Sequence, residues 1–353
     1  MKIAIINDTH CGMRNSSDIF IEYQDTFYTK VFFPYLKENG IKQIIHLGDY
    51  FDHRKYINMK AQNANRKMFL DVLKEEGIHM DIIPGNHDVF YKNTNDLCTL
   101  KELLGYYTSN INIVMKPKVL DYDGCSIALL PWINSENYVE SINFIKTCKA
   151  SILGAHLELI GFDMMKGMPN THGMTTEIFD RFEMVLSGHF HTKSSKGNIH
   201  YLGSQMEFTW ADCEDQKYFH VLDTATREIT PVKNPYTMFE KLVYNDEQID
   251  YNSYVVPNLD NKFVKVIVAK KSDPYIFDKF LDKLNDQEIY ELKIAETFEE
   301  FIGDNVNDES ISVEDTTQLL DSYVDAVDTT LNKPMLKSLM RNLFVEAQSM
   351  EIA

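Results

Sequence analysis

The sequence predicts an α/β fold in which a largely parallel sheet is connected by helices. Short apolar runs alternate with longer stretches whose apolar residues recur at helical spacing. The first two helical stretches end at Gly40 and Gly77, and each is followed directly by another apolar run. Because parallel strands need a crossover between them, this alternation of strand and helix favours a parallel sheet.

The first part of the chain supplies three strand–helix pairs. We expect strands over residues 2–7, 43–47 and 78–83, and helices over 19–39, 58–76 and 96–104. The first strand has four apolar residues in a row, from Ile3 to Ile6, which indicates burial on both faces. The pairs Gly48-Asp49 and Pro84-Gly85 end the second and third apolar runs.

The region up to residue 236 is expected to be richer in strands. We expect strands over residues 111–115, 118–121, 126–131, 151–155, 184–186, 199–202, 218–223 and 228–232, and a helix over 136–147. Asp123-Gly124 has the composition of a hairpin turn between two of these strands. Residues 1–236 would then form the main domain.

Three further segments follow the main domain. Residues 237–298 contain a predicted strand (263–269), helix (274–284) and strand (289–294), which indicates a small α+β domain. Residues 299–311 form an acidic linker with few apolar residues. Residues 312–353 predict two amphipathic helices separated by Asn332-Lys333-Pro334. This helix pair either folds back on its own domain or binds a partner helix, and the linker favours the second interpretation.

The composition excludes several classes of protein. No run of about 18 apolar residues occurs, so we expect no membrane-spanning helix. The apolar stretch at the N-terminus is too short for a signal peptide. The five cysteines lack CxxC spacing, which is typical of reduced thiols in the cytoplasm. We therefore expect a cytoplasmic protein.

The net charge of −18 argues against a protein that coats nucleic acid by itself. The charge is uneven, however. Eleven Asp or Glu residues and no Lys or Arg lie between Lys293 and Lys333, and removing those eleven charges from −18 leaves −7. Weak binding to DNA therefore stays open, with a partner supplying the basic surface.

Five short motifs carry metal-binding residue types, and each follows a predicted strand. They are Asp8-Thr9-His10, Gly48-Asp49-Tyr50-Phe51-Asp52, Gly85-Asn86-His87-Asp88, Gly154-Ala155-His156 and Gly188-His189-Phe190-His191. In open α/β sheets, ligands bind at the carboxyl ends of the strands. A mixed set of Asp, Asn and His side chains favours Mn²⁺, Fe²⁺ or Zn²⁺ over Ca²⁺. Each motif alone is weak, but five in this order predict a two-metal phosphoesterase.

The motifs suggest how two metal ions would share the ligands. A carboxylate can bridge two ions about 3.5–4 Å apart, and Asp49 is the best candidate for this role. One ion would be completed by Asp8, His10 and His191, and the other by Asn86, His156 and His189. His87 lies next to a ligand and is the candidate catalytic residue, because it could protonate the leaving oxygen.

These residues resemble the signature of the calcineurin-like metallophosphoesterases. The resemblance rests on Asp8-x-His10-x-Gly12, Gly48-Asp49-x-x-Asp52, Gly85-Asn86-His87-Asp88, His156 and Gly188-His189-x-His191. It implies a β-sandwich flanked by helices, with two metal ions held as described above.

A narrower resemblance, to the SbcD-type DNA repair nucleases, covers nearly the whole chain and is closest to the nuclease subunits of phage recombination endonucleases. It rests on the motifs above together with Leu129-Leu130-Pro131-Trp132 and Tyr201-Leu202-Gly203-Ser204. It implies a Mn²⁺-dependent (or Mg²⁺-dependent) enzyme with 3′-to-5′ exonuclease action on duplex DNA ends and endonuclease action on single strands.

The same resemblance implies partners and a cellular setting. Residues 237–298 would be a capping domain, and residues 312–353 would bind the coiled coil of an SbcC-type ATPase. The chain would act as a homodimer within a heterotetramer, in DNA recombination, repair and replication, in the host cytoplasm if a phage encodes it. The expected partner-binding residues are Leu336, Leu339, Met340, Leu343 and Phe344.

The chain departs from this family next to the second motif. Some cellular members have a His where Asp52 stands, whereas here the His is one residue later, at His53. Asp52, His53, Arg54 and Asp88 are therefore candidates either for orienting ligands or for contacting DNA. The basic stretch that begins at His53 could instead be a solvated loop.

Two rival functions remain, and three aromatic residues have a second interpretation. One rival is a phosphatase or phosphodiesterase for small substrates, which the acidic C-terminal segment disfavours. The other is a non-catalytic scaffold on DNA ends that regulates the ATPase, which the complete ligand set disfavours. Trp132, Tyr201 and Phe208 are expected to be core residues, although Tyr201 and Phe208 could stack on bases.

Overall fold

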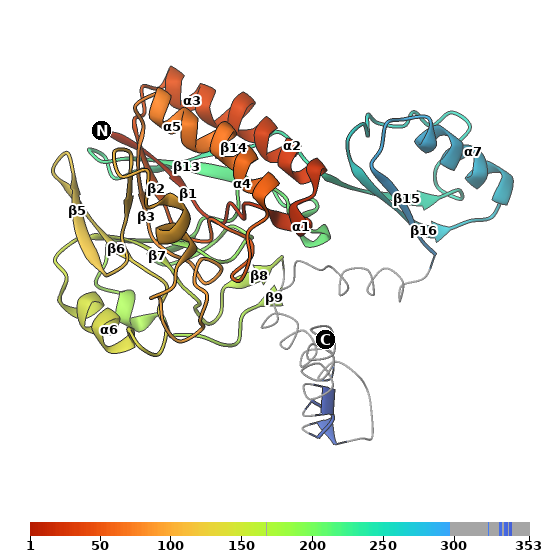
Figure 1. Ribbon diagram of the computed structural model, residues 1–353. Coiled ribbons are helices and arrows are strands. Elements are labelled where there is room, and N and C mark those ends of the chain that lie inside the picture. Colours follow the sequence, from red (N-terminus) through yellow and green to blue (C-terminus); the bar gives the residue numbers. More distant parts are fainter. Residues whose placement is uncertain (167, 297–323, 325–331, 334, 338, 341–353) are drawn as a thin grey trace. The chain divides into compact units, whose positions relative to one another are not determined.

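The computed structural model of the chain describes residues 1–166, 168–296, 324, 332–333, 335–337 and 339–340 (Figure 1). It divides into two compact units. The first comprises Met1–Glu240 with Leu259–Phe263, and the second comprises Lys241–Asn258 with the described residues from Val264 onwards.

The first sheet of the larger unit has six strands in the order β14-β13-β1-β2-β3-β4. Their bounds are β1 (Lys2–Ile6), β2 (Gln43–His46), β3 (His79–Ile82), β4 (Ile111–Ile113), β13 (Tyr218–Asp223) and β14 (Ile229–Lys233). Strands β1 to β4 run parallel, as the alternation of strand and helix predicts, while β13 pairs antiparallel with both β1 and β14.

The second sheet also has six strands, in the order β11-β12-β10-β7-β6-β5. Their bounds are β5 (Lys118–Tyr122), β6 (Cys125–Leu130), β7 (Ile152–His156), β10 (Met184–Gly188), β11 (Ser194–Lys196) and β12 (Ile199–Tyr201). The four central strands are parallel and the two edge strands are antiparallel. A hairpin, β8 (Asp163–Met165) and β9 (Met168–Pro169), follows β7.

The two sheets pack face to face, so the strands expected in one parallel sheet form a sandwich, as the family resemblance implied. One hydrophobic cluster contains Ile5 and Ile45 from the first sheet together with Leu129 and Ile152 from the second. At Gly154 a Cβ atom would lie 2.9 Å from the Leu47 side chain, which shows how closely the layers approach. The core between the sheets leaves the carboxyl ends of the parallel strands of both layers at one edge.

Helices cover the outer faces of both sheets (Figure 1). The region expected as one helix over 19–39 is α2 (Asp18–Phe27), a π-helical turn and α3 (Phe33–Glu38), preceded by the short α1 (Met13–Ser16). The region expected over 58–76 is likewise α4 (Met59–Asn65), a π-helical turn and α5 (Asp71–Glu75). The helix expected over 96–104 is shorter, because only Leu100–Leu104 is helical.

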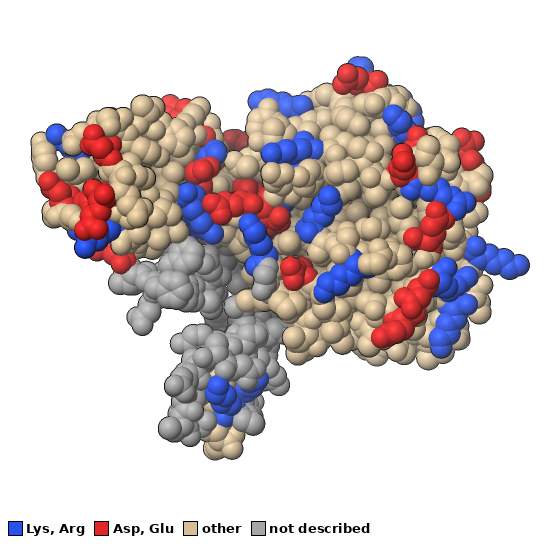
Figure 2. Space-filling view, turned by 180° about the vertical axis from the view of Figure 1, so that it is seen from behind, with Lys and Arg blue, Asp and Glu red and all other residues tan. Residues whose placement is uncertain are grey.

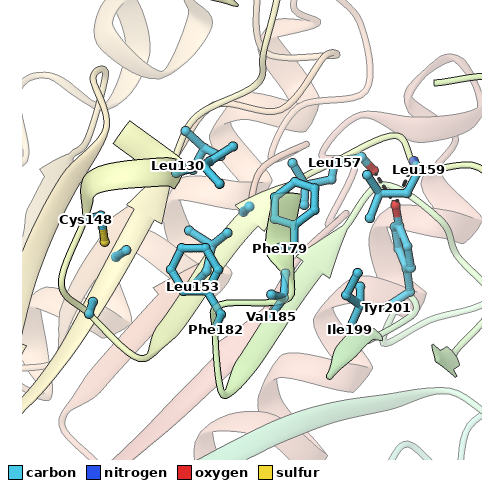
Figure 3. Close-up of a cluster of buried hydrophobic side chains, with 14 of the residues drawn as sticks. Leu130, Cys148, Leu153, Leu157, Leu159, Phe179, Phe182, Val185, Ile199 and Tyr201 are labelled. Atoms are coloured by element: carbon cyan, nitrogen blue, oxygen red, sulfur yellow. Dashed lines mark hydrogen bonds between the residues drawn. The ribbon is translucent and has the colours of Figure 1, made fainter. Parts of the chain in front are cut away.

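A second hydrophobic cluster lies between the outer face of the second sheet and α6 (Tyr138–Thr147). Figure 3 shows part of this cluster, including Leu153 and Val185 from neighbouring strands. The Tyr201 hydroxyl donates to the Leu157 carbonyl (2.9 Å) and accepts from the Leu159 N–H (3.1 Å). Tyr201 is therefore a core residue, and it fixes the backbone immediately after β7.

The second unit is a small α+β domain. Its sheet has the order β15-β16-β17, with β15 (Phe239–Asn245), β16 (Phe263–Lys270) and β17 (Glu291–Ala295), and α7 (Pro274–Asn285) connects the last two strands. Asp273 caps α7 by accepting from the backbone N–H groups of Tyr275 and Ile276. The ring of Phe280 on α7 lies 5.3 Å from the ring of Tyr244 on β15.

Little of the predicted C-terminal helix pair belongs to the described part of the chain. Leu336, Leu339 and Met340 are helical, and Leu339 is 52% exposed. The expected linker (299–311), Leu343 and Phe344 lie outside the described residues. None of the helices that the structure describes is long and apolar enough to cross a membrane.

Glu207 anchors the end of the first unit. The residue is 1% exposed, and its carboxylate accepts hydrogen bonds from the backbone N–H groups of Met238 (2.6 Å) and Phe239 (3.0 Å). Burial raises the pKa of Glu207 to about 7, although both hydrogen bonds favour the ionised form. The carboxyl group therefore titrates near neutral pH.

The titration of Glu207 should make the stability of the protein depend on pH. Because its pKa is raised above the ordinary value of 4.5, the folded state binds more protons, and the free energy of unfolding should fall as the pH rises from about 5 to about 8. Compared with Glu207→Gln, which keeps an acceptor but cannot ionise, the wild type should lose on the order of 3 kcal/mol. Urea unfolding of both proteins at the two pH values measures this difference, and an equal change in both would contradict the prediction.

Candidate metal centre

The five predicted motifs converge at the edge where the parallel strands of both sheets end. Four of the expected ligands have a left-handed backbone, with φ values of 48° at Asp8, 43° at His10, 55° at Asp49 and 92° at His189. Non-glycine residues rarely adopt this conformation, which costs on the order of 1–3 kcal/mol each. Such strain concentrated at one edge is typical of a functional site.

Glycines allow the second and third motifs to approach each other. Gly48 has φ +91°, and a Cβ atom there would lie 2.7 Å from both the Gly85 nitrogen and the His156 ring. A Cβ at Gly85 would collide with Asp49. No larger residue fits either position without moving the backbone that carries Asp49.

The first group of ligands contains Asp8, His10 and His191, whose ligand atoms all lie within 4.8 Å of one another. The Nε2 atoms of His10 and His191 are 3.1 Å apart. The Asp8 carboxylate accepts from the backbone N–H of His189 at 3.1 Å, which holds the loop after β10 against the loop after β1.

The second group contains Asp49, His156 and His189, also within 4.8 Å of one another. His156 Nε2 lies 3.2 Å from Asp49 Oδ2 and 3.0 Å from Asn86 Oδ1. His189 Nδ1 lies 3.0 Å from the same Asn86 oxygen. The structure therefore brings all seven expected ligands together in the two groups that the sequence predicts.

The residues around these groups orient the ligands as a metal would require. The outer nitrogen of His156, Nδ1, lies 2.7 Å from the Leu47 carbonyl, and His10 Nδ1 lies 3.3 Å from the Asp52 carboxylate. Metal-binding histidines usually donate their second N–H to such an acceptor, which leaves the other lone pair for the ion. Two imidazole nitrogens 3.1 Å apart would repel through their lone pairs unless a proton or a cation lies between them. Divalent metal ions fit this donor set.

The pKa values of the histidines show how strongly the site attracts positive charge. Burial lowers the pKa of His10, but its hydrogen bond to Asp52 and the charges of Asp49, Asp52 and Asp8 outweigh burial and raise the pKa to about 9. At His156 burial also lowers the pKa, and Asp49 more than reverses this, again to about 9. Because metal ions must displace these protons, acid should weaken metal binding.

Asp49 lies between the two groups. Burial acts to raise its pKa, but the neighbouring histidines, His156 and His87 first, hold the pKa well below its usual range. The Asp49 Oδ1 atom accepts from the backbone N–H of His87 at 2.8 Å, while Oδ2 faces His156. The charge of Asp49 also raises the pKa of His10, so it acts on both groups.

His87 lies at the rim of the centre and is partly exposed. Its Nδ1 atom is 2.7 Å from the backbone carbonyl of Asp52, and its ring lies 5.0 Å from the ring of His10. Nδ1 is therefore committed to the protein, and Nε2 is the nitrogen left for proton transfer.

The residues with two expected roles separate in the structure. The Asp52 carboxylate faces His10 and is 3.5 Å from His53 Nε2, while the His53 ring stacks on Tyr56 at 4.6 Å. His53 and Arg54 are partly exposed. Asp88 is fully buried, so the expectation of a DNA contact there is wrong. Its carboxylate instead accepts three backbone N–H groups, those of Tyr50, Phe51 and Gly85, and holds the second motif to the third.

Three residues near the centre did not stand out in the sequence as parts of the site. Lys217 is 3% exposed and donates to the His191 carbonyl at 2.9 Å, with Asp212 and Asp215 as its other acceptors. The Phe208 ring lies 5.1 Å from the ring of His191. Trp132, expected in the core, is only partly buried, and its ring lies 5.4 Å from that of His189. Their positions in the chain give no signal of these contacts.

Replacement of Asp49 should abolish binding at both metal sites. Because its carboxylate acts on both ligand groups, we expect Asp49→Ala to bind no divalent ion tightly, whereas the wild type should bind two. Titration calorimetry with Mn²⁺ measures the stoichiometry. Asp81→Asn is the matched control, since Asp81 is a buried carboxylate whose described partners are Gln43, Asn112 and Tyr122. Two bound ions in Asp49→Ala would refute the bridging role.

Comparisons with known proteins agree with this geometry. The family profile described as calcineurin-like phosphoesterase matches residues 1–193, a range that contains all seven expected ligands. The sequence is 32% identical over 351 residues to exonuclease subunit 1 of Enterobacteria phage T4, which covers 98% of this chain and 99% of that protein.

Solved structures with similar folds include an archaeal phosphodiesterase and a protein of Thermus thermophilus. The first is 14% identical and covers 66% of this chain and 100% of its own, with a TM-score of 0.34. The second is 12% identical and covers 66% of this chain and 98% of its own, with a TM-score of 0.37. The family profile and the full-length relative together place the chain: it belongs to the calcineurin-like phosphoesterase family, whose members use divalent metal ions.

Proposed function

We propose that the chain is a two-metal DNA nuclease. The observation that carries this proposal is the similarity, over nearly the whole chain, to a phage protein named as an exonuclease subunit. A complete set of converging ligands supports it, since a non-catalytic relative would be expected to have lost some of them. The proposed activities are 3′-to-5′ exonuclease action on duplex ends and endonuclease action on single strands.

The proposed ligand assignment follows the two groups of the metal centre. Asp8, His10 and His191 would hold one ion, Asn86, His156 and His189 would hold the other, and Asp49 would bridge them. Mn²⁺ is the ion that we propose, because it accepts imidazole, carboxylate and amide ligands together, and Mg²⁺ is the second candidate. When bound, two such ions supply Lewis-acid catalysis and a nucleophile at neutral pH.

The protein residues would position the phosphodiester and move a proton. His87 is held through Nδ1 by the Asp52 carbonyl, so Nε2 can donate a proton to the oxygen that leaves phosphorus. Asp52 also faces His10 through its carboxylate and would keep that ring in the orientation that leaves Nε2 for an ion. Asp52 would therefore support both the ligand and the proton donor.

Charge limits how this chain would bind DNA. The net charge is −18, and Figure 2 shows a face on which lysine and arginine side chains are scattered singly rather than joined into one patch. His53 and Arg54, partly exposed beside the centre, are the proposed local phosphate contacts. Such a surface suits contact with one DNA end more than with a long duplex.

The remaining affinity would come from a partner. We propose that an SbcC-type coiled-coil ATPase binds residues 312–353, through Leu336, Leu339 and Met340 together with Leu343 and Phe344. The chain would be a homodimer within a heterotetramer, and residues 237–298 would be the capping domain. Its setting would be recombination, repair and replication of DNA in the cytoplasm of a bacterial host.

Digestion of end-labelled linear duplex DNA tests the nuclease activity. The purified chain should shorten DNA in Mn²⁺, and His87→Ala should be slower by about 10²- to 10⁴-fold, as expected when a general acid is lost. His79→Ala is the matched control, because His79 is an exposed histidine at the start of β3. Equal rates for His87→Ala and the control would refute the role of His87.

The same assay separates the nuclease from a phosphodiesterase for small substrates. Bis-p-nitrophenyl phosphate is cleaved by either enzyme. If the chain hydrolyses this ester but leaves DNA intact in Mn²⁺ and in Mg²⁺, with and without the ATPase and ATP, the nuclease proposal is wrong. Binding of DNA ends without cleavage of either substrate would favour the scaffold.

Removal of residues 312–353 should uncouple the two activities of the complex. The truncated chain should still hydrolyse bis-p-nitrophenyl phosphate, because every expected metal ligand lies before residue 192, but it should not alter ATP hydrolysis by the ATPase. Leu339→Asp, a single change at an exposed leucine, should weaken the same coupling. Coupling at the wild-type level in the truncated chain would refute the docking role.

A further inference from the structure

A small pocket lies beside the metal centre. It has a volume of 170 Å³ and is lined by residues that follow β6 and β7, among them Trp132, Ser135, Tyr138, His156 and Glu158. No step of the proposed reaction uses this pocket.

The size of the pocket suits a single ring. A cavity of roughly 150 Å³ inside a protein is large enough to bind benzene. Pockets that hold whole drug-sized molecules are larger, about 300–1,000 Å³. With 170 Å³, the pocket can take one heterocyclic ring but not a nucleotide together with its sugar and phosphate.

The chemistry of the walls suits a nucleobase rather than a phosphate. Among the described residues that line the pocket none is Lys or Arg, and the carboxylate of Glu158 would repel an anion. Trp132 offers an aromatic wall, on which bases of any sequence can stack. A carboxylate such as that of Glu158 accepts from the exocyclic amino group of cytosine, and adenine and guanine carry amino groups too.

The pocket and the metal centre share a wall. His156 lines the pocket and is also an expected metal ligand. The Trp132 ring lies 5.8 Å from the ring of His156 and 5.4 Å from that of His189. A ring in the pocket would therefore be separated from the metal centre by one imidazole. In a nucleic acid the group at this distance from a phosphate is the base of an adjoining nucleotide.

The walls are held in place before any ligand binds. The Trp132 carbonyl accepts from the side chains of Asn95 (3.0 Å) and Asn137 (2.9 Å), and its N–H donates to the Pro84 carbonyl (2.9 Å). After β7, the backbone carbonyl of Glu158 accepts from the N–H of Met174 at 2.9 Å. A preformed pocket avoids the entropic cost of ordering its walls when it binds a ligand.

We propose that this pocket is a nucleobase subsite, which receives the base of a nucleotide adjoining the scissile phosphate. Trp132 is its stacking wall, and Glu158 accepts from an exocyclic amino group. The inference rests on the proposed nuclease function, because it requires that the phosphate of the same nucleic acid lies at the metal centre. It assigns a role to Trp132 that core packing does not.

Kinetics with abasic substrates test the subsite. Oligonucleotides that lack the base at either position flanking the scissile phosphate are compared with the intact strand. For the wild type, one abasic position should lower kcat/KM by about tenfold, within the range that stacking on an aromatic side chain supplies. For Trp132→Leu, the same abasic change should have almost no effect, because the wall is already missing. An equal abasic effect in both proteins would overturn the subsite.

A filled pocket gives a second variant that leaves the ligands alone. Ser135→Phe adds a ring to the pocket wall and should reduce the abasic effect in the same way as Trp132→Leu. Ser109→Phe is the matched control, since Ser109 is an exposed serine outside the pocket. If Ser135→Phe retains the full abasic effect, the base binds elsewhere and the proposal is wrong.

A binding measurement separates this proposal from the nuclease activity. The chain contains two tryptophans, so a Trp210→Phe background leaves Trp132 as the sole tryptophan fluorophore. Deoxycytidine monophosphate in Mg²⁺ should quench its fluorescence saturably, and Ser135→Phe should abolish this quenching. Quenching without any DNA cleavage would refute the nuclease and leave the base site standing. DNA cleavage without quenching at millimolar nucleotide would refute the base site alone.

Discussion

The structure depends on the buried negative charge of Asp49. A carboxylate in the interior is costly unless other groups compensate its charge, and here histidines of both ligand groups do so. The same charge raises the pKa of His10 and of His156 to about 9. In the absence of metal ions, protons must therefore take part of the role of the cations. The loops of the centre are stable only while positive charge of one kind or the other lies between them.

Around the ligands lies a set of groups that hold them but do not face the centre. The Leu47 carbonyl and the Asp52 carboxylate orient two histidines, Lys217 holds the backbone of His191, and Asp88 ties together the second and third motifs. These contacts offset the cost of the left-handed residues, because each strained turn is fixed from outside by a buried hydrogen bond. The ligand geometry is thus a property of the whole edge of the sandwich rather than of the ligands alone.

The sequence was sufficient to predict the ligands but not the layers. Each ligand follows a strand and a short motif, which are both local features, and the two groups have the predicted members. The pairing of strands into two sheets is not local, since β6 and β1 have similar apolar runs although they lie in opposite layers. Asp88 was misjudged for a related reason. Its place in Gly85-Asn86-His87-Asp88 shows that it is near the centre, but only the fold shows that its carboxylate faces inward.

The charge of the chain also constrains how the proposed enzyme would bind its substrate. With a net charge of −18, it cannot derive strong binding to long duplexes from the release of counterions. Positive charge is instead concentrated at one point, where two metal ions would hold a single phosphate. The adjoining pocket has no Lys or Arg among its described lining residues and would add contact with a single base. Such a site distinguishes an accessible nucleotide from a stacked one, because only an unstacked base can enter the pocket. Selection of DNA ends and single strands would then follow from the geometry of the site, while affinity for the rest of the DNA would have to come from the partner.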